Sequence, residues 1–397
     1  MKSAIIKKYI NEKLFGAVYD KHELVVIDDI FPLKLSPFRL VEYNHILENI
    51  PGSAVYSSGK SFIVLGDNKS FEQVHKEYSQ SNPDVAKRVF EFNKSTKISA
   101  QLCYLTFLNN AHDNLKYLRS LGIPFVLELY PGGGFKLNDK RSDKRLKRVT
   151  NSPLFKKVIV TQEVTSRYLI DKGFCLPEQI EFVFGGVFPA EQLTKELRPK
   201  RYFPHDKEHL DICFVAHKYM EQGRDKGYDV FIEVAHMLAE LLPEVSFHVV
   251  GPFNATDIDI SLIENRITFH GSRTTDFFPT FYAGMDIILS PNAPGILSPG
   301  AFDGFPTGAC IEAALCGTVI FACDLMELNP FRDGEEIVII PRDPSEICRM
   351  ILEYAEKPEL LYQIARNSQN RFQETFSIEK QMAPRLQILK QLLSNGR

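Results

Sequence analysis

The sequence predicts an α/β protein made of two Rossmann-like domains that face each other across a cleft. Its 397 residues exceed the length at which one hydrophobic core usually keeps growing. Short apolar runs alternate with helix-like segments throughout, which is typical of parallel sheets with crossover helices. A charged stretch broken by two prolines, Leu193 to Leu210, divides this alternation into two series of similar length. We interpret that stretch as the linker.

The first series predicts one α/β unit. Its strands are expected near Leu24–Ile27, Phe62–Leu65, Ala100–Leu105, Pro124–Leu129, Lys157–Thr161 and Ile180–Phe184. Apolar residues at three- and four-residue spacing predict helices over Leu40–Leu47, His112–Leu121 and Glu163–Asp171. Gly122 and Gly173 stand where a left-handed residue would end two of these helices.

The second series predicts a second unit of the same kind. Its strands are expected near Ile212–Val215, Val245–Val250, Ile267–His270, Met285–Leu289, Thr318–Ala322 and Glu336–Ile340. After Pro358 the chain is expected to be helical to its end, apart from a break near Ser377. The expected division is therefore residues 1–200, residues 201–375 and a terminal helix, residues 376–397.

Composition excludes several classes of protein. The 44% hydrophobic and 24% charged content is that of an ordinary folded soluble protein, and no apolar run is long enough to span a membrane. The apolar part of MKSAIIKKYINEK is too short for a secretion signal, so we expect a cytoplasmic protein. Seven scattered cysteines without a CxxC pair predict reduced, buried thiols. We expect no nucleic-acid partner.

Charge is distributed unevenly along the chain. The first 200 residues carry 30 lysines and arginines against 22 acidic residues, whereas the remainder carries 17 against 28. Much of the excess lies in KLNDKRSDKRLKR, Lys136 to Arg148. This segment is either a solvated helix or loop face, or a surface that attracts an anionic membrane. The second interpretation predicts peripheral binding at the inner face of the membrane.

The strongest candidate site is the loop SPNAPGILSPGAFDGFPTGACIEAALCG, which follows an expected strand. Gly300, Gly304 and Gly308 would let the backbone approach a ligand. The helix from about Thr307 to Leu315 would direct free amide groups at a phosphate. One turn further along, Glu312 is placed to accept hydrogen bonds from ribose hydroxyls.

This segment resembles the signature of glycosyltransferase family 4, in which two acidic residues bracket a nucleotide-sugar site. The resemblance implies a GT-B fold whose C-terminal helix crosses back to the first domain. It assigns Glu312 to ribose and Asp303 to the donor sugar, although Asp303 is an aspartate and lies nine positions before Glu312, one more than the family norm. The backbone from Gly304 through Phe305, Pro306 and Thr307 to Gly308 would line the donor.

The resemblance places two cations in the loop after the expected strand Ile212–Val215. Lys226 matches the family lysine that stabilises the leaving diphosphate, while Lys218 and Arg224 are both candidates for the family arginine. Further similarity lies in HVVGPF, ITFHGS and YAGMDIILSP. The family implies retention of anomeric configuration, with no obligatory metal and no cofactor besides the sugar-nucleotide substrate.

The acceptor side carries fewer signals. The family histidine is absent from ELYPGGGF, where Tyr130 with Gly132 and Gly133 either lines the acceptor pocket or forms an ordinary glycine-rich turn. No GxGxxG, Walker, HExxH or GxSxG motif occurs, and DID at 257–259 does not resemble a metal motif.

The predicted function is therefore transfer of a hexose from a nucleoside diphosphate sugar to a glycan or glycolipid hydroxyl, in the synthesis of a cell-surface polysaccharide or glycoconjugate. The alternatives are a non-catalytic glycosyltransferase-like subunit, a GT-B sugar-nucleotide epimerase or phosphorylase, and an NAD-dependent oxidoreductase. Fold by itself does not separate them.

Overall fold

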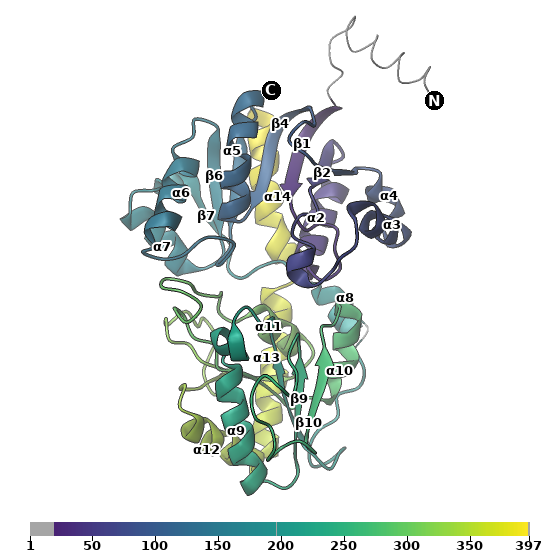
Figure 1. Cartoon of the computed structure of the whole chain (residues 1–397), viewed down its shortest axis with the longest axis vertical. Coiled ribbons are helices and arrows are strands. Elements are labelled where there is room, and N and C mark those ends of the chain that lie inside the picture. Colours follow the sequence, from purple (N-terminus) through teal and green to yellow (C-terminus); the bar gives the residue numbers. More distant parts are fainter. Residues whose placement is uncertain (1–19, 196, 396–397) are drawn as a thin grey trace, which may run out of the picture.

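The computed structural model describes residues 20–195 and 197–395. These residues form two domains, one above the other in Figure 1, and each domain is built on a parallel β-sheet flanked by helices. The last two helices, coloured yellow, run along both domains.

Seven parallel strands form the first sheet, in the order β3-β2-β1-β4-β5-β6-β7. The strands are β1 (Asp20–Asp28), β2 (Ser53–Ser57), β3 (Val89–Glu91), β4 (Ile98–Thr106), β5 (Phe125–Leu129), β6 (Phe155–Val160) and β7 (Ile180–Phe182). In register, Val26 of β1 lies between Val55 and Tyr104. The central strands are apolar because helices cover both faces of the sheet.

The covering helices divide between the two faces. Helices α2 (Pro37–Asn49) and α14 (Ile378–Asn395) pack on one face, and α5 (Leu108–Leu121), α6 (Lys140–Thr150) and α7 (Glu163–Asp171) pack on the other. The remaining helices near this sheet are α3 (Phe71–Ser81) and α4 (Pro83–Ala86). Gly122 ends α5 in the left-handed conformation, as predicted, and Gly173 has a positive φ just beyond α7.

The first half also corrects two expectations. The predicted strand Phe62–Leu65 is wrong, since Ile63–Leu65 form a 3-10 turn in which Ile63 and Val64 are exposed. Conversely, β2 and β3 were not expected. The strand β2 is buried throughout, but its five residues include two serines, so a short hydrophobic run does not reveal it.

Six parallel strands form the second sheet, in the order β10-β9-β8-β11-β12-β13. They are β8 (Leu210–Val215), β9 (Val245–Val250), β10 (Ile267–Gly271), β11 (Ile287–Ser290), β12 (Val319–Ala322) and β13 (Val338–Ile339). All six overlap the predicted strands. The α-helices between them are α9 (Tyr228–Leu241), α10 (Phe278–Gly284) and α11 (Gly308–Leu315), and α12 (Pro344–Ala355) follows the last strand.

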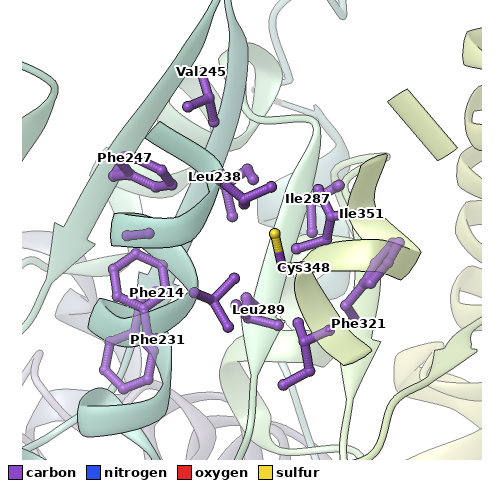
Figure 2. Close-up of a cluster of buried hydrophobic side chains, with 14 of the residues drawn as sticks. Phe214, Phe231, Leu238, Val245, Phe247, Ile287, Leu289, Phe321, Cys348 and Ile351 are labelled. Atoms are coloured by element: carbon purple, nitrogen blue, oxygen red, sulfur yellow. The ribbon is translucent and has the colours of Figure 1, made fainter. Parts of the chain in front are cut away.

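The core of the second domain lies on both faces of this sheet. Figure 2 shows one face, where phenylalanines from strands and helices interdigitate with aliphatic side chains; the labelled members include Phe214, Phe231, Phe247, Leu289, Phe321 and Ile351. The opposite face packs against α10 and α11. All seven cysteines of the chain are buried and free of disulfides, as expected.

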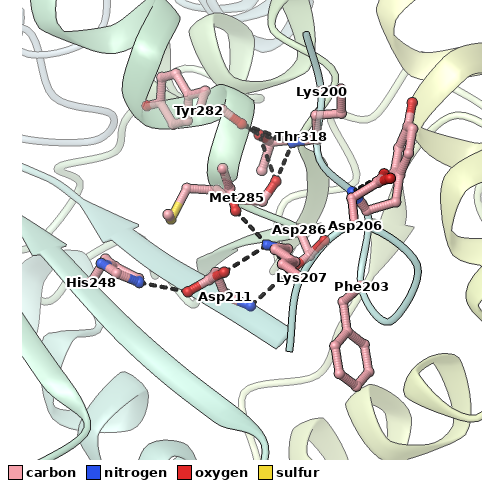
Figure 3. A network of polar contacts seen from close by, with 12 residues as sticks. Lys200, Phe203, Asp206, Lys207, Asp211, His248, Tyr282, Met285, Asp286 and Thr318 are labelled. Carbon is pink, nitrogen blue, oxygen red and sulfur yellow. Dashed lines mark hydrogen bonds and ion pairs between the residues drawn. The ribbon is translucent and has the colours of Figure 1, made fainter. Parts of the chain in front are cut away.

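The linker is tied to the second sheet by a network of polar contacts (Figure 3). Its first three residues, 193–195, are the end of α8 (Ala190–Lys195). Further along, the Lys200 ammonium donates to the carbonyl oxygens of Tyr282, at 2.7 Å, and Met285. Lys207 pairs with Asp211 at 2.6 Å and with Asp286 at 2.5 Å. Both aspartates stand at the amino ends of strands, so this network holds the edge opposite to the one where ligands bind in open α/β sheets.

The C-terminal helices confirm the predicted crossing. Helix α13 (Pro358–Thr375) packs on α11 and β12. The helical conformation is interrupted around Ser377, and α14 then packs against the first sheet. There the Arg385 guanidinium makes two hydrogen bonds to the Glu128 carboxylate, at 2.6 and 2.9 Å, with both side chains fully buried.

Candidate functional site

The two predicted halves of the site come together beyond the carboxyl ends of β8 and β11. Lys226, in the loop after β8, forms an ion pair with Asp303 in the loop after β11. The Asn292 amide donates to the same carboxylate oxygen of Asp303 at 2.8 Å. The Lys226 ammonium also lies 5.3 Å from the centre of the Tyr219 ring. Asn292 and Tyr219 therefore join a cluster for which the sequence indicated only the charged pair.

The other two candidate cations point elsewhere. Lys218 binds both carboxylate oxygens of Asp257 at 2.8 Å, and the exposed Arg224 donates to the side chain of Gln222 at 2.9 Å. Neither forms a hydrogen bond or ion pair with Asp303 among the described residues. Only Lys226 of the three cations contacts the acidic half of the site.

His217 is a neighbour of this cluster that the sequence did not indicate. It lies two residues beyond the end of β8, and its ring centroid lies 4.8 Å from that of Tyr219. Burial lowers the pKa of His217, and the positive charge of Lys226 lowers it further. The available signal was its position, because side chains just beyond a strand face the ligand edge of the sheet.

Glu312 lies in α11, whose N-terminus is open. Thr307 is the N-cap residue but makes no capping hydrogen bond with its side chain, which leaves the first amides of α11 available to a ligand. Burial raises the pKa of Glu312 to about 8. Within residues 20–195 and 197–395, no side chain forms a hydrogen bond or ion pair with its carboxyl group. A buried acid without a partner is a strong candidate for contact with ligand hydroxyls.

The glycines of the donor loop lie close to residues of the first domain. A Cβ atom on Gly300 would lie 1.9 Å from the carbonyl oxygen of Leu137, and one on Gly304 would lie 3.1 Å from Nε2 of Gln162. A Cβ atom on Gly308 would meet the Phe188 ring at 3.2 Å. These glycines let the loop approach residues that precede the linker.

Further contacts join the same loop to the first domain. The Leu137 N–H donates to the Gly300 carbonyl at 2.9 Å, and the Phe305 N–H donates to the Gln162 side-chain oxygen at 3.3 Å. Phe305 is buried, and a cis peptide bond joins it to Pro306. The donor loop is thus held between the two domains.

The acceptor-side candidates lie at the ends of the central strands of the first sheet. Tyr130 follows β5 directly, and its ring contacts those of Phe38 and Phe107 at centroid distances of 5.5 and 5.7 Å. Gly132 and Gly133 both have positive φ, and Gly133 packs closely on Phe107. These glycines form a tight turn, and this turn packs against the cluster of Phe38, Phe107 and Tyr130.

Neither a metal site nor a membrane span is found in the part of the chain that the structure describes. No three histidine, cysteine or acidic side chains there are grouped as metal ligands. No helix among these residues is both long and apolar enough to cross a bilayer.

Comparisons with known proteins agree with this architecture. Residues 231–387 match the family described as glycosyl transferase-like. No curated protein sequence matches the chain. Similar solved structures include HepE of Anabaena in complex with UDP, with a TM-score of 0.64 and 16% identity over 92% of this chain and 99% of that one.

Two further structures extend the comparison. Sucrose-phosphate synthase of Thermosynechococcus elongatus has a TM-score of 0.61 and 15% identity over 94% of this chain and 100% of that one. A glycosyltransferase of Rickettsia africae has a TM-score of 0.60 and 14% identity over 95% of this chain and 100% of that one. With two Rossmann-like domains and a C-terminal helix that crosses back, the chain has the GT-B fold.

Proposed function

We propose that this protein is a retaining glycosyltransferase that moves a hexose from a nucleoside diphosphate sugar to a hydroxyl group of a glycan or glycolipid. The GT-B fold and the glycosyl transferase-like match over residues 231–387 support a sugar-transfer enzyme. HepE, one of the similar structures, is described in complex with UDP-glucose. In this proposal, the transfer takes part in the synthesis of a cell-surface polysaccharide or glycoconjugate.

One arrangement carries the proposal: the loop that bears Asp303 of the Lys226–Asp303 pair leads directly into α11, which carries the unpartnered Glu312 carboxyl group in its second turn. The open N-terminus of α11 suits a diphosphate, because its free amides and helix dipole favour negative charge. Glu312 would accept hydrogen bonds from the ribose hydroxyls. Asp303 and Asn292 would then face the transferred sugar.

In the proposed reaction, Lys226 exchanges partners. Without donor it neutralises Asp303; with donor bound it would turn to the diphosphate and stabilise the charge that develops as the glycosidic bond breaks. No metal ion is needed for that step, because the cation is supplied by the protein. A leaving-phosphate oxygen would take the acceptor proton on the same face of the sugar, which retains the anomeric configuration.

Turnover of sugar nucleotides tests the donor site. A panel of nucleoside diphosphate sugars is first screened for thermal stabilisation of the protein, since a ligand that binds only the folded state raises its melting temperature. For the donor that binds, Glu312→Ala and Lys226→Ala are each expected to lower kcat/KM by at least about 100-fold. Arg349→Ala removes an exposed arginine that pairs with Glu353 and serves as the matched control.

The products decide between the alternatives. Transfer to an added glycoside supports the proposal, while isomerised sugar nucleotide formed without acceptor would identify an epimerase. Binding of sugar nucleotide with no turnover would indicate a non-catalytic subunit. Unchanged turnover in both variants would refute the assignment of Glu312 and Lys226.

We further propose that the protein works at the cytoplasmic face of an anionic membrane. Helix α6 carries most of the basic segment, and a surface groove is lined by Arg119, Lys144, Lys147, Arg148 and Asn151, without an acidic side chain. A lipid-linked or membrane-bound acceptor would be concentrated by this groove.

A further inference from the structure

Three half-buried aromatic side chains meet at the edge of the first sheet that faces the second domain. Phe38 lies in the first turn of α2, Phe107 precedes α5, and Tyr130 follows β5. Their ring centroids are 5.5 to 6.2 Å apart in edge-on and tilted pairs. We call these three residues the aromatic platform.

The platform is supported from within by Arg39. Its guanidinium lies 5.0 Å from the ring centroids of both Phe38 and Phe107. Its charge is already matched, because Asp28 accepts a hydrogen bond from the Arg39 Nε at 2.9 Å inside the fold. The platform therefore offers aromatic surface without a free charge.

The backbone at Phe107 is constrained in an unusual conformation. With φ 71° and ψ 146°, Phe107 is in a region that residues other than glycine rarely adopt. Gly133 makes room for its ring, since a Cβ atom there would lie 2.2 Å from ring carbon Cδ1 of Phe107. Strain of this kind, held by surrounding contacts, is typical of functional positions.

The platform also lies near the donor half of the site. Burial raises the pKa of Tyr219 in the second domain, and the positive charge of Arg39, beneath Phe38 and Phe107, is near enough to act in the opposite direction on that pKa. The Tyr219 ring in turn contacts the Lys226 ammonium. A group resting on the platform would therefore be near the reacting end of a bound donor.

We propose that Phe38, Phe107 and Tyr130 form the acceptor subsite and bind an uncharged sugar ring. This rests on the proposed glycosyl transfer and names its acceptor class. The C–H groups on one side of a pyranose are weakly positive and pack against the negative face of an aromatic ring, whereas a phosphate group would need a cation that the platform lacks. The acceptor chemistry at this position is thus that of a glycan terminus.

A tryptophan reporter tests the platform directly. The chain has no tryptophan, so Phe38→Trp places a single indole in the platform, and Phe182→Trp places one at the exposed end of β7 as the matched control. Methyl α-glucoside, α-mannoside and β-galactoside are titrated in the presence of UDP, with glycerol 3-phosphate and inorganic phosphate as anionic probes. We expect at least one glycoside to change the emission of Phe38→Trp saturably and to leave Phe182→Trp unchanged.

A second variant separates binding from folding. Phe107→Gly removes the ring at a position whose backbone suits glycine, so the fold should be kept. In the Phe38→Trp background it is expected to weaken glycoside binding about tenfold, the loss of one good aromatic contact. The response of melting temperature to UDP is expected to stay unchanged.

Three results would overturn the inference: no saturable response to any glycoside, a response to the phosphate compounds alone, or equal responses in the two reporters. The proposed function fails separately, if no sugar nucleotide stabilises the wild-type protein. A platform that binds glycosides in a protein without donor binding would still be an established sugar site.

Discussion

At the residue scale, Glu312 has the clearest physical consequence. An isolated carboxyl group in a buried position favours its neutral form, and its pKa rises to about 8. Ribose hydroxyls that donate hydrogen bonds would favour the ionised form instead. Glu312 is therefore placed to release a proton when a donor binds near neutral pH.

This raised pKa predicts a pH dependence of stability. Below the unfolded-state pKa near 4.5, Glu312 is protonated in both states. Between that value and about 8 only the unfolded state loses the proton, so the free energy of unfolding falls as pH rises. Relative to Glu312→Gln, the wild type should lose up to about 5 kcal/mol in its free energy of unfolding across this window.

Urea unfolding of both proteins at pH 4.5, 6, 7 and 8.5 measures the effect. The free energies of unfolding of the wild type and the glutamine variant should be similar at the lowest pH. Their difference should grow as the pH rises, with the glutamine variant the more stable. Parallel curves would mean that Glu312 titrates normally and is well solvated.

At the element scale, α14 is held against the first domain by a buried network of charged side chains. Burial and the neighbouring Glu128 raise the pKa of Glu42 well above its usual value, so Glu42 holds a proton. Burial also opposes ionisation of Glu128, but the Arg385 charge and the hydrogen bonds with Glu42, Tyr104 and Arg385 together outweigh burial, so the pKa of Glu128 is lowered. The Tyr104 hydroxyl contacts both carboxyl groups. One arginine therefore balances one carboxylate in the interior.

Replacing Arg385 should show how much this pairing of charges contributes to the free energy of unfolding. Arg385→Met leaves Glu128 buried without its cation, and we expect a loss of about 3–5 kcal/mol in the free energy of unfolding. Arg385→Met combined with Glu128→Gln removes both charges and should recover much of that loss. Urea unfolding of the single and double variants measures both values; equal losses in the two proteins would show that Arg385 acts through packing alone.

At the scale of the whole molecule, the charge asymmetry separates two kinds of surface. The basic groove is lined by residues of α5 and α6 in the first domain and by Asn151 just after α6, whereas the Lys226–Asp303 pair lies in loops of the second domain. An anionic bilayer would attract the groove through several lysines and arginines, each contributing about 1 kcal/mol near the surface.

Vesicle binding checks this proposal. Full-length protein should co-sediment with vesicles containing phosphatidylglycerol and much less with phosphatidylcholine alone, and the binding should weaken with added salt. Reversal of charge at Lys144, Lys147 and Arg148 should abolish it without changing donor binding. Equal binding to neutral and anionic vesicles would refute the membrane role of the groove.

Much of the fold could be predicted because its signals are local. Alternating apolar runs indicated most strands, and the break near Ser377 separated α13 from α14. The strand β2 was not predicted because its two serines and its tyrosine are buried by pairing with β1. That contact is distant in sequence, so no local pattern indicates it. The 3-10 turn at Ile63–Leu65 looked like a strand because a short apolar run fits either conformation.

By itself, the sequence determined the two α/β units, the linker between them, and the helix that carries Glu312. Tertiary structure alone decided that Lys226, and neither Lys218 nor Arg224, meets Asp303, and that the donor-loop glycines approach the first domain. It also brought Phe38, Phe107 and Tyr130 together from three separate elements. The physical reason is that periodicity specifies which face of an element is buried, whereas the order of parallel strands specifies which loops become neighbours.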